Sequence, residues 1–381
     1  MSDLLAFFED RTDEIVNLVN DLVRFESPSR DKRLVDVLGT HIHTLLEALG
    51  AQVAVIPRET AGDIRLAKWN AAGAGLPILG MVHIDTVWPE GTLGNTVSIK
   101  VEDGRLHGPG ALDMKGGIAI FLEAIRGLRD RDEFPERPIW LLLTTDEELG
   151  SVASAELIVE TAKQCGLCFV PEPAAENEGL KTSRKGVAQY WLTAKGVASH
   201  AGSAPEAGVN AIIELAHQAL AVHKLNKLRD GTSVSMTTIS GGTTGNVIPA
   251  EATGYVDVRF FHSAEADRVD EAIKGLQPAT LGAKIEVRGG INRYPLERNA
   301  QMIETFQQAK AIAEKIGLPL GEAAVGGGSD GNLTAAAGIP TLDGLGGQGD
   351  GMHALHEHVL IRSLYRRAAL VAAILRDWQF A

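Results

Sequence analysis

Three consecutive acids follow an apolar run in residues 141–151, LLLTTDEELGS. A leucine-rich run bounded by turn formers predicts a strand that is covered on both faces, as in a parallel sheet. Asp146, Glu147 and Glu148 would then lie at the carboxyl end of that strand, where open α/β sheets bind their ligands. Carboxylates packed there repel one another, which favours a bound cation. The alternative is an acidic, solvated helix N-terminus.

Further candidate ligands occur at His83 and Asp113. His83 follows a predicted strand, and Asp85 two residues later supplies a carboxylate that can accept the other imidazole N–H, as metal-binding histidines usually require. An exposed loop pair is the alternative. Asp113 lies in GPGALDMKGG, residues 108–117, where glycines permit turns that aim a carboxylate inward. Its alternative role is a helix N-cap.

Two more segments carry metal-ligating residue types. Glu172 is flanked by prolines directly after a predicted strand, so it is held in a rigid, extended turn; a solvated surface acid is the alternative. The glycine loop GDGMHALHEHV, residues 349–359, offers three histidines, and their spacing does not select among them: His353, His356 and His358.

The surrounding pattern predicts two domains of different architecture. Residues 4–23, 34–49 and 118–128 show helical spacing. Strands are predicted at 53–56, 64–69, 77–82 and 167–170, and in the run that ends at residue 144. This alternation predicts an α/β fold with an open, mostly parallel sheet and flanking helices. From about residue 184 the order becomes β-α-β-β-α-β, a complete ferredoxin-like α+β unit. We therefore expect a discontinuous domain, 1–183 and 295–381, with residues 184–294 inserted.

Composition narrows the function classes. The chain has 381 residues, 45% of them apolar and 22% charged, with a formal net charge of -13, which disfavours nucleic acid as a partner. No apolar run reaches transmembrane length, and the N-terminus lacks signal-peptide regions, so we expect no membrane partner and a cytoplasmic location. The two cysteines, Cys165 and Cys168, form one CxxC, for which core packing is favoured over redox chemistry.

In combination, eight motifs give the chain a resemblance to the M20 metallopeptidases, and within them to glutamate carboxypeptidases of the carboxypeptidase G2 type. The resemblance covers nearly the whole chain. The motifs are MVHIDTVWPEGT (81–92), GPGALDMKGG (108–117), TTDEELGS (144–151), PEP (171–173), SHAG (199–202), GNVIP (245–249), GGGSD (326–330) and HALHEHV (353–359).

This resemblance implies a site for two zinc ions, with manganese or cobalt as alternatives. One ion would be bound by His83, Asp113 and Glu172. The other would be bound by Asp113, Glu148 and His353, so that Asp113 bridges the two ions. The resemblance further implies that Asp85 orients His83, that Glu147 is the catalytic base, and that a cis peptide follows Asp113.

The resemblance also implies substrate contacts and a dimer. Substrate-binding positions of the family correspond here to Asn246, Arg259, Arg293 and Gly328. The inserted domain would form a homodimer and act as a lid, with His200 reaching the partner's active site. Arginine can bind a carboxylate bidentately, so a substrate with a free carboxylate is expected. Each arginine alone is more often part of a surface ion pair.

Three functions compete. The first is a carboxypeptidase that releases a C-terminal amino acid, with glutamate as one candidate, from a small peptide or N-acyl substrate. Glu172 favours it, because family aminopeptidases tend to have aspartate there. The lysine that recognises glutamate in the resembled enzymes has no clear equivalent in LKTSRKG, residues 180–186. The second is an N-acyl-amino-acid deacylase or dipeptidase. The third, an inactive metal-binding regulator, is disfavoured because every catalytic position carries a competent residue.

Overall fold

A computed structural model describes residues 3–380 and divides them into two compact units. The first unit contains residues up to Ser183, then Arg298–Val325 and the chain from Ser329 onward. The second unit contains Arg184–Glu297 together with Gly326–Gly328. No helix in the described part of the chain is long and apolar enough to cross a membrane.

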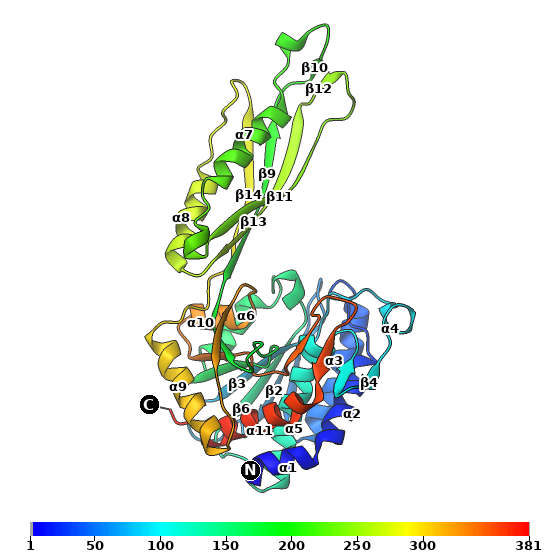
Figure 1. Cartoon of the computed structure of the whole chain (residues 1–381), viewed down its shortest axis with the longest axis vertical. Helices are drawn as coiled ribbons and strands as arrows, with labels where there is room; N and C mark the ends of the chain where they lie inside the picture. Colours follow the sequence, from blue (N-terminus) through cyan, green and yellow to red (C-terminus); the bar gives the residue numbers. More distant parts are fainter. Residues whose placement is uncertain (1–2, 381) are drawn as a thin grey trace. The chain divides into compact units, whose positions relative to one another are not determined.

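The first unit is built on a six-stranded sheet in the order β1-β2-β6-β3-β7-β16 (Figure 1). Strands β6, β3, β7 and β16 are parallel, whereas β2 pairs antiparallel with both of its neighbours, so the predicted mostly parallel α/β sheet is confirmed. The strands are β1 (Gln52–Ile56), β2 (Ile64–Trp69), β3 (Ile78–His83), β6 (Ile139–Thr144), β7 (Leu167–Val170) and β16 (Thr341–Asp343).

Side chains of the central strand β6 alternate between two cores. Leu141 and Leu143 point into the larger core, which is formed in part by the helices α1 (Asp3–Asp10), α2 (Thr12–Val23), α3 (Lys32–Ala48), α5 (Gly116–Asp130), α9 (Ala300–Lys315) and α11 (Ile361–Asp377). Trp140 and Leu142 point into a smaller core with residues of α6 (Ala155–Ala162) and α10 (Gly331–Ala336). The sheet is therefore covered on both faces, as the continuous apolar run predicts.

The helices of the first unit agree with the predicted segments, with one break. The predicted helix over residues 4–23 is two helices that meet at Arg11. The helices are α1 (Asp3–Asp10), α2 (Thr12–Val23), α3 (Lys32–Ala48), α4 (Thr92–Asn95), α5 (Gly116–Asp130), α6 (Ala155–Ala162), α9 (Ala300–Lys315), α10 (Gly331–Ala336) and α11 (Ile361–Asp377), with short turns η1 (Ala111–Lys115) and η2 (Glu147–Leu149).

Two small sheets complete this unit. One has the order β17-β18-β5-β4, and the other pairs β15 with β8. Their strands are β4 (Lys100–Glu102), β5 (Arg105–His107), β8 (Leu180–Arg184), β15 (Glu322–Val325), β17 (Gly349–Asp350) and β18 (His358–Leu360).

The second unit is a ferredoxin-like fold with a four-stranded antiparallel sheet in the order β11-β13-β9-β14. Its helices α7 and α8 cover one face, over a core that includes Tyr190, Leu192, Val256 and Phe260. The elements are β9 (Gly186–Lys195), β10 (Ser199–His200), η3 (Pro205–Ala207), α7 (Ala211–His223), η4 (Leu228–Asp230), β11 (Ser233–Gly241), β12 (Val247–Ile248), β13 (Glu251–Phe260), α8 (Ser263–Lys274) and β14 (Lys284–Arg293).

Candidate metal centre

The carboxyl ends of three neighbouring strands place imidazole and carboxylate groups at one edge of the large sheet. His83 is the last residue of β3, Glu147 and Glu148 follow β6 in η2, and Glu172 lies two residues beyond β7. Because β6, β3 and β7 are parallel and adjacent, these segments leave the sheet at the same edge.

Asp113 lies between the two imidazoles of the site. Its Oδ1 is 3.1 Å from His83 Nε2, and its Oδ2 is 3.3 Å from His353 Nε2. Its backbone is non-helical within η1, and the residue that precedes α5 is Lys115, so Asp113 is not the N-cap of that helix. The peptide bond from Asp113 to Met114 is cis.

Two further carboxylates complete the cluster, one beside each imidazole. Glu172 Oε1 is 3.5 Å from His83 Nε2, and Glu148 Oε1 is 3.3 Å from His353 Nε2. Glu172 is 6% exposed, so it is not a solvated surface acid. Ligand atoms of His83, Asp113 and Glu148 lie within 4.8 Å of one another, close enough to share a metal ion.

The structure distinguishes among the three histidines of the glycine loop. His353 has a φ of +61°, in the left-handed region that is uncommon for non-glycine residues, and its imidazole reaches Asp113 and Glu148. The ring of His358 instead lies 5.1 Å from that of His107 on β5. Only His353 of the three makes a described contact with the acidic cluster.

Asp85 and Asp146 are both buried but have different environments. His83 Nδ1 lies 3.0 Å from the backbone carbonyl oxygen of Asp85 and 3.5 Å from its carboxylate, so the carbonyl is the closer acceptor. Asp146 accepts hydrogen bonds from Ala153 N and Ser154 Oγ, each at 2.6 Å. Of the three consecutive acids, Asp146 therefore stabilises the following turn.

Mutual attraction and repulsion shift the pKa values in this cluster. Hydrogen bonds to Asp113 and Glu148 raise the pKa of His353 to about 10. Burial raises the pKa of Glu148 to about 7, and the negative charge of Asp113 adds to this effect. Burial opposes ionisation of Asp113, but hydrogen bonds to His353 and His83 outweigh it and lower the pKa of Asp113. Such a cluster is suited to a cation.

Sequence interpretation did not single out two buried acids near these segments. Glu357 accepts hydrogen bonds from the backbone N–H groups of the segment that carries Asp113. Asp330, the last residue of GGGSD, accepts hydrogen bonds from Thr144 Oγ1 at 3.0 Å and Ser151 Oγ at 2.5 Å. The sequence signal for each residue was an acid within a family motif. Its role could not be inferred, because the groups that it binds are distant in the sequence.

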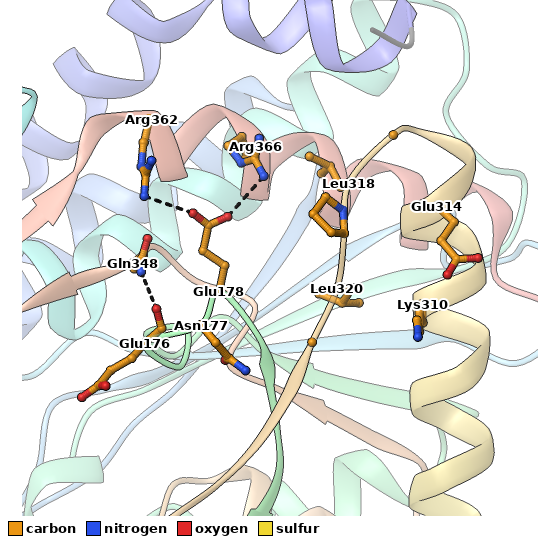
Figure 2. A pocket seen from close by; sticks show the side chains of 13 residues that line it. Glu176, Asn177, Glu178, Lys310, Glu314, Leu318, Leu320, Gln348, Arg362 and Arg366 are labelled. Carbon is orange, nitrogen blue, oxygen red and sulfur yellow. Dashed lines mark hydrogen bonds and ion pairs between the residues drawn. The ribbon is translucent and has the colours of Figure 1, made fainter.

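The loop that follows Glu172 is fixed to α11. The carboxylate of Glu178 lies between Arg362, at 3.4 Å, and Arg366, at 3.2 Å, as Figure 2 shows. Arg367 is buried and donates to the backbone carbonyl of Glu178 at 2.6 Å. These contacts attach the loop at Glu178, six residues after Glu172. The pocket drawn in Figure 2 lies beside this attachment and is lined by residues other than those of the acidic cluster.

Three of the expected substrate-binding residues lie at one end of the second unit. Arg259 and Arg293 both pair with Val187 of β9, and Gly328 lies beside the same residue. Arg293 is 4% exposed. The guanidinium of Arg259 binds the carboxylate of Asp257 through two nitrogens, each 2.9 Å from an oxygen.

His200 and Asn246 lie together beyond the other end of β9, where β10 and β12 form a separate two-stranded sheet. His200 pairs with Val247, and the backbone carbonyl of Asn246 accepts from Ala201 N at 2.8 Å. His200 Nδ1 accepts the backbone N–H groups of Gly202 and Ser203, both at 3.1 Å. In the neutral imidazole the proton must therefore be on Nε2, which is available as a donor.

Comparisons with known proteins identify the family of the chain. A sequence profile of the peptidase family M20/M25/M40 matches residues 79–377. Carboxypeptidase G2 from Pseudomonas sp. (strain RS-16) is 32% identical, over 98% of this chain and 92% of its own length. Succinyl-diaminopimelate desuccinylase from Delftia acidovorans is 30% identical, over 79% of this chain and 83% of its own length.

Solved structures give the same fold. The aminopeptidase PepT from Bacillus cereus superposes with a TM-score of 0.76 at 25% identity, covering 96% of this chain and 98% of its own. An M20 family metallo-carboxypeptidase from Sulfolobus solfataricus has a TM-score of 0.76 at 17% identity, covering 99% of each chain.

Proposed function

Because the chain belongs to the peptidase family M20/M25/M40 and is therefore a hydrolase, we propose that it uses two divalent metal ions to hydrolyse an amide bond and release a C-terminal amino acid. The substrate would be a small peptide or an N-acyl amino acid with a free carboxylate, and glutamate is one candidate product. The observation that carries the proposal is the contact of two imidazoles with different oxygens of Asp113.

The residues of the cluster fit two metal ions. His83, Asp113 and Glu172 would bind one ion, and Asp113, Glu148 and His353 the other. Glu148 Oε1 is buried, and its described partner is the imidazole of His353 at 3.3 Å; a cation bound between these two groups would stabilise the buried carboxylate. Imidazole and carboxylate ligands suit zinc, and also manganese or cobalt.

Each neighbouring residue then has a separate role. When bound, the ions supply Lewis acidity that polarises the scissile carbonyl and acidifies the attacking water. Glu147, beside Glu148 in η2, would take a proton from that water and pass it to the leaving amine, a contribution of ~10²–10⁴ in rate. Glu148 would be committed as a ligand and could not do both. Asp85 would position His83 and the η2 turn.

Substrate binding is assigned to two groups of residues in the inserted domain. Arg259, Arg293 and Gly328 would bind the carboxylate end of the substrate, and the guanidinium of Arg259 is also paired with Asp257. His200, through Nε2–H, and Asn246 would stabilise the developing oxyanion.

The two groups lie at opposite ends of β9 within one subunit. The ten residues of β9 separate them, a length of about 33 Å at 3.3 Å per residue. We therefore assign His200 and Asn246 to the active site of a second copy in a homodimer. Exposed apolar side chains on α7 and β11 support such an interface: Ile213, Leu220 and Ile239.

A substrate panel tests the proposal. It includes a folyl-glutamate, N-acetyl amino acids and dipeptides, each compared with the matching C-terminal amide. The carboxypeptidase assignment predicts cleavage of the free acids with strong preference over the amides. The desuccinylase relative supports the alternative, an N-acyl-amino-acid deacylase, for which turnover would follow the acyl group.

Arg293→Ala adds a residue-level test. For a carboxylate substrate the change should lower kcat/KM by a factor that corresponds to ~2 kcal/mol or more of lost transition-state stabilisation. For the matching amide the loss should be far smaller. Arg288→Ala, which removes an exposed arginine from the same strand, is the control. Equal losses on acid and amide would eliminate the anchoring role.

A further inference from the structure

The carboxylate of Glu357 is buried and accepts four N–H groups. Its Oε1 accepts from the backbone N–H of Leu112 at 2.9 Å and of Asp113 at 3.1 Å. Its Oε2 accepts from the backbone N–H of Gly110 and from the indole of Trp88, both at 2.9 Å. Glu357 is 2% exposed, and each oxygen thus has two donors in place of water.

Three of these four donors belong to the segment that ends in Asp113. A carboxylate binds backbone N–H groups more strongly than a neutral acceptor does, because the hydrogen bonds are charge-assisted. The backbone from Gly110 to Asp113 is therefore fixed against one side chain. The backbone carbonyl of Glu357 also accepts from Gly108 N at 3.3 Å.

Glu357 is only four residues from His353 in the chain, and the loop between them is compact. Glu357 N donates to Ala354 O at 2.9 Å, and Ala354 N donates to Gly351 O at 2.8 Å. The loop that presents His353 thus also fixes the backbone of Asp113. This arrangement sets the 3.3 Å approach of His353 Nε2 to Asp113 Oδ2.

We infer that Glu357 is a positioning residue of the metal centre: its carboxylate joins the Asp113 segment to the His353 loop and thereby sets the separation of these two ligands. The inference rests on the proposed function, because it takes Asp113 and His353 as ligands of one ion. Glu357 itself touches neither ion nor substrate. Partners of this kind typically contribute 10–100-fold to metal affinity.

The test measures zinc affinity of the metal-free full-length protein by competition with a chromophoric chelator. In Glu357→Gln, an NH₂ group replaces one of the two carboxylate oxygens. This group is a donor and faces two N–H donors, so two hydrogen bonds are lost. We expect at least one of the two zinc equivalents to bind 10–100-fold less tightly, with an unchanged circular dichroism spectrum. Glu357→Asp, which keeps the charge on a shorter side chain, should recover part of this loss.

Glu123→Gln is the matched control. Glu123 on α5 is also fully buried, but it is paired with Arg126 of the same helix and with Arg11, which precedes α2, and it contacts none of the proposed ligands. Its replacement should lower the melting temperature and leave both zinc affinities within about twofold of the wild type. A similar loss of affinity in Glu123→Gln and Glu357→Gln would overturn the inference, since it would indicate a general effect of destabilisation.

Two other variants cover the remaining outcomes. If Glu357→Gln does not fold, Trp88→Phe removes one donor and should still weaken zinc binding several-fold; wild-type affinity in that variant would overturn the inference. Asp113→Ala separates the two proposals. If it retains both zinc equivalents, the proposed metal site is wrong. If it loses them while Glu357→Gln binds zinc like the wild type, only the positioning role is wrong.

Discussion

The Oδ1 atom of Asp85 accepts a hydrogen bond from the backbone N–H of Glu147 at 3.3 Å. Its Oδ2 accepts from the backbone N–H of Glu148, also at 3.3 Å. The backbone carbonyl of the same residue lies 3.0 Å from His83 Nδ1. Asp85 thus connects a candidate ligand on β3 with the turn that carries the candidate base on η2.

Asp85→Asn should therefore impair catalysis more than metal binding. The asparagine amide group would face one of the two backbone N–H groups and displace the η2 turn, whereas the carbonyl contact to His83 is a backbone feature that the substitution keeps. We expect kcat/KM to fall by ~10–100-fold, with the metal content unchanged. Steady-state kinetics with metal analysis on the same sample checks this. Wild-type kcat/KM would show that the carboxylate has no such role.

Glu147→Gln and Glu148→Gln should differ in what they lose. Removing the base should lower kcat by at least ~10² without loss of metal, because Glu147 is assigned no metal contact. Removing Glu148 should cost about half of the bound metal, because it serves one of the two ions. Metal analysis of both variants decides. Loss of half the metal from Glu147→Gln would reverse the two roles.

Metal affinity should rise with pH. Ligands must be deprotonated to bind, and in the metal-free protein the pKa of His353 is raised to about 10 and that of Glu148 to about 7. Between pH 7 and 10 binding must displace the proton of His353, and below pH 7 also that of Glu148. From pH 8 down to pH 6 we expect the apparent affinity to fall by about tenfold or more per pH unit.

Calorimetry of zinc binding in two buffers with different ionisation enthalpies counts the released protons. At pH 8 we expect at least one proton per protein chain, from His353. His83 adds to this number, because, against the effect of burial, its hydrogen bond to Asp113 raises its pKa well above the usual value, and Glu148 adds to it as the pH falls below 7. An affinity independent of pH, with no proton release, would contradict the assignment of His353 and Glu148 as ligands.

His200 allows a mixing test of the dimer. If it serves the partner's active site, Glu147→Gln and His200→Ala homodimers, each nearly inactive, should complement each other after joint unfolding and refolding. Half of the dimers would be mixed, and each would contain one site with neither defect, so about a quarter of wild-type activity should return. If heterodimers form and activity stays absent, His200 does not act in the partner's site.

Local patterns predicted the architecture because each depends on near neighbours in the chain. The continuous apolar run that ends at Thr144 predicts a strand covered on both faces, and the β-α-β-β-α-β order predicts the second fold. The family resemblance and the α/β class are confirmed. The prediction of one long helix over residues 4–23 was wrong at Arg11, where the chain turns between two helices. The apolar spacing continues across this turn and so does not reveal it.

Side-chain direction could not be predicted in the same way. Asp146 precedes Glu147 directly, yet its carboxylate binds Ser154, because that choice depends on where the next turn folds. Spacing in the sequence did not show which of the three histidines contacts the acidic cluster. His353 differs from the other two in its left-handed backbone, which spacing does not reveal. The role of Glu357 depends on contacts more than 240 residues away in the chain.

The central claim is that two metal ions share Asp113. Anomalous diffraction at the zinc edge, from crystals of the zinc-loaded protein, tests it directly. The account predicts two peaks per chain about 3.5–4 Å apart, one beside His83 and Glu172 and the other beside Glu148 and His353, with Asp113 between them. A single peak, or two peaks of which one lies away from Asp113, would contradict it.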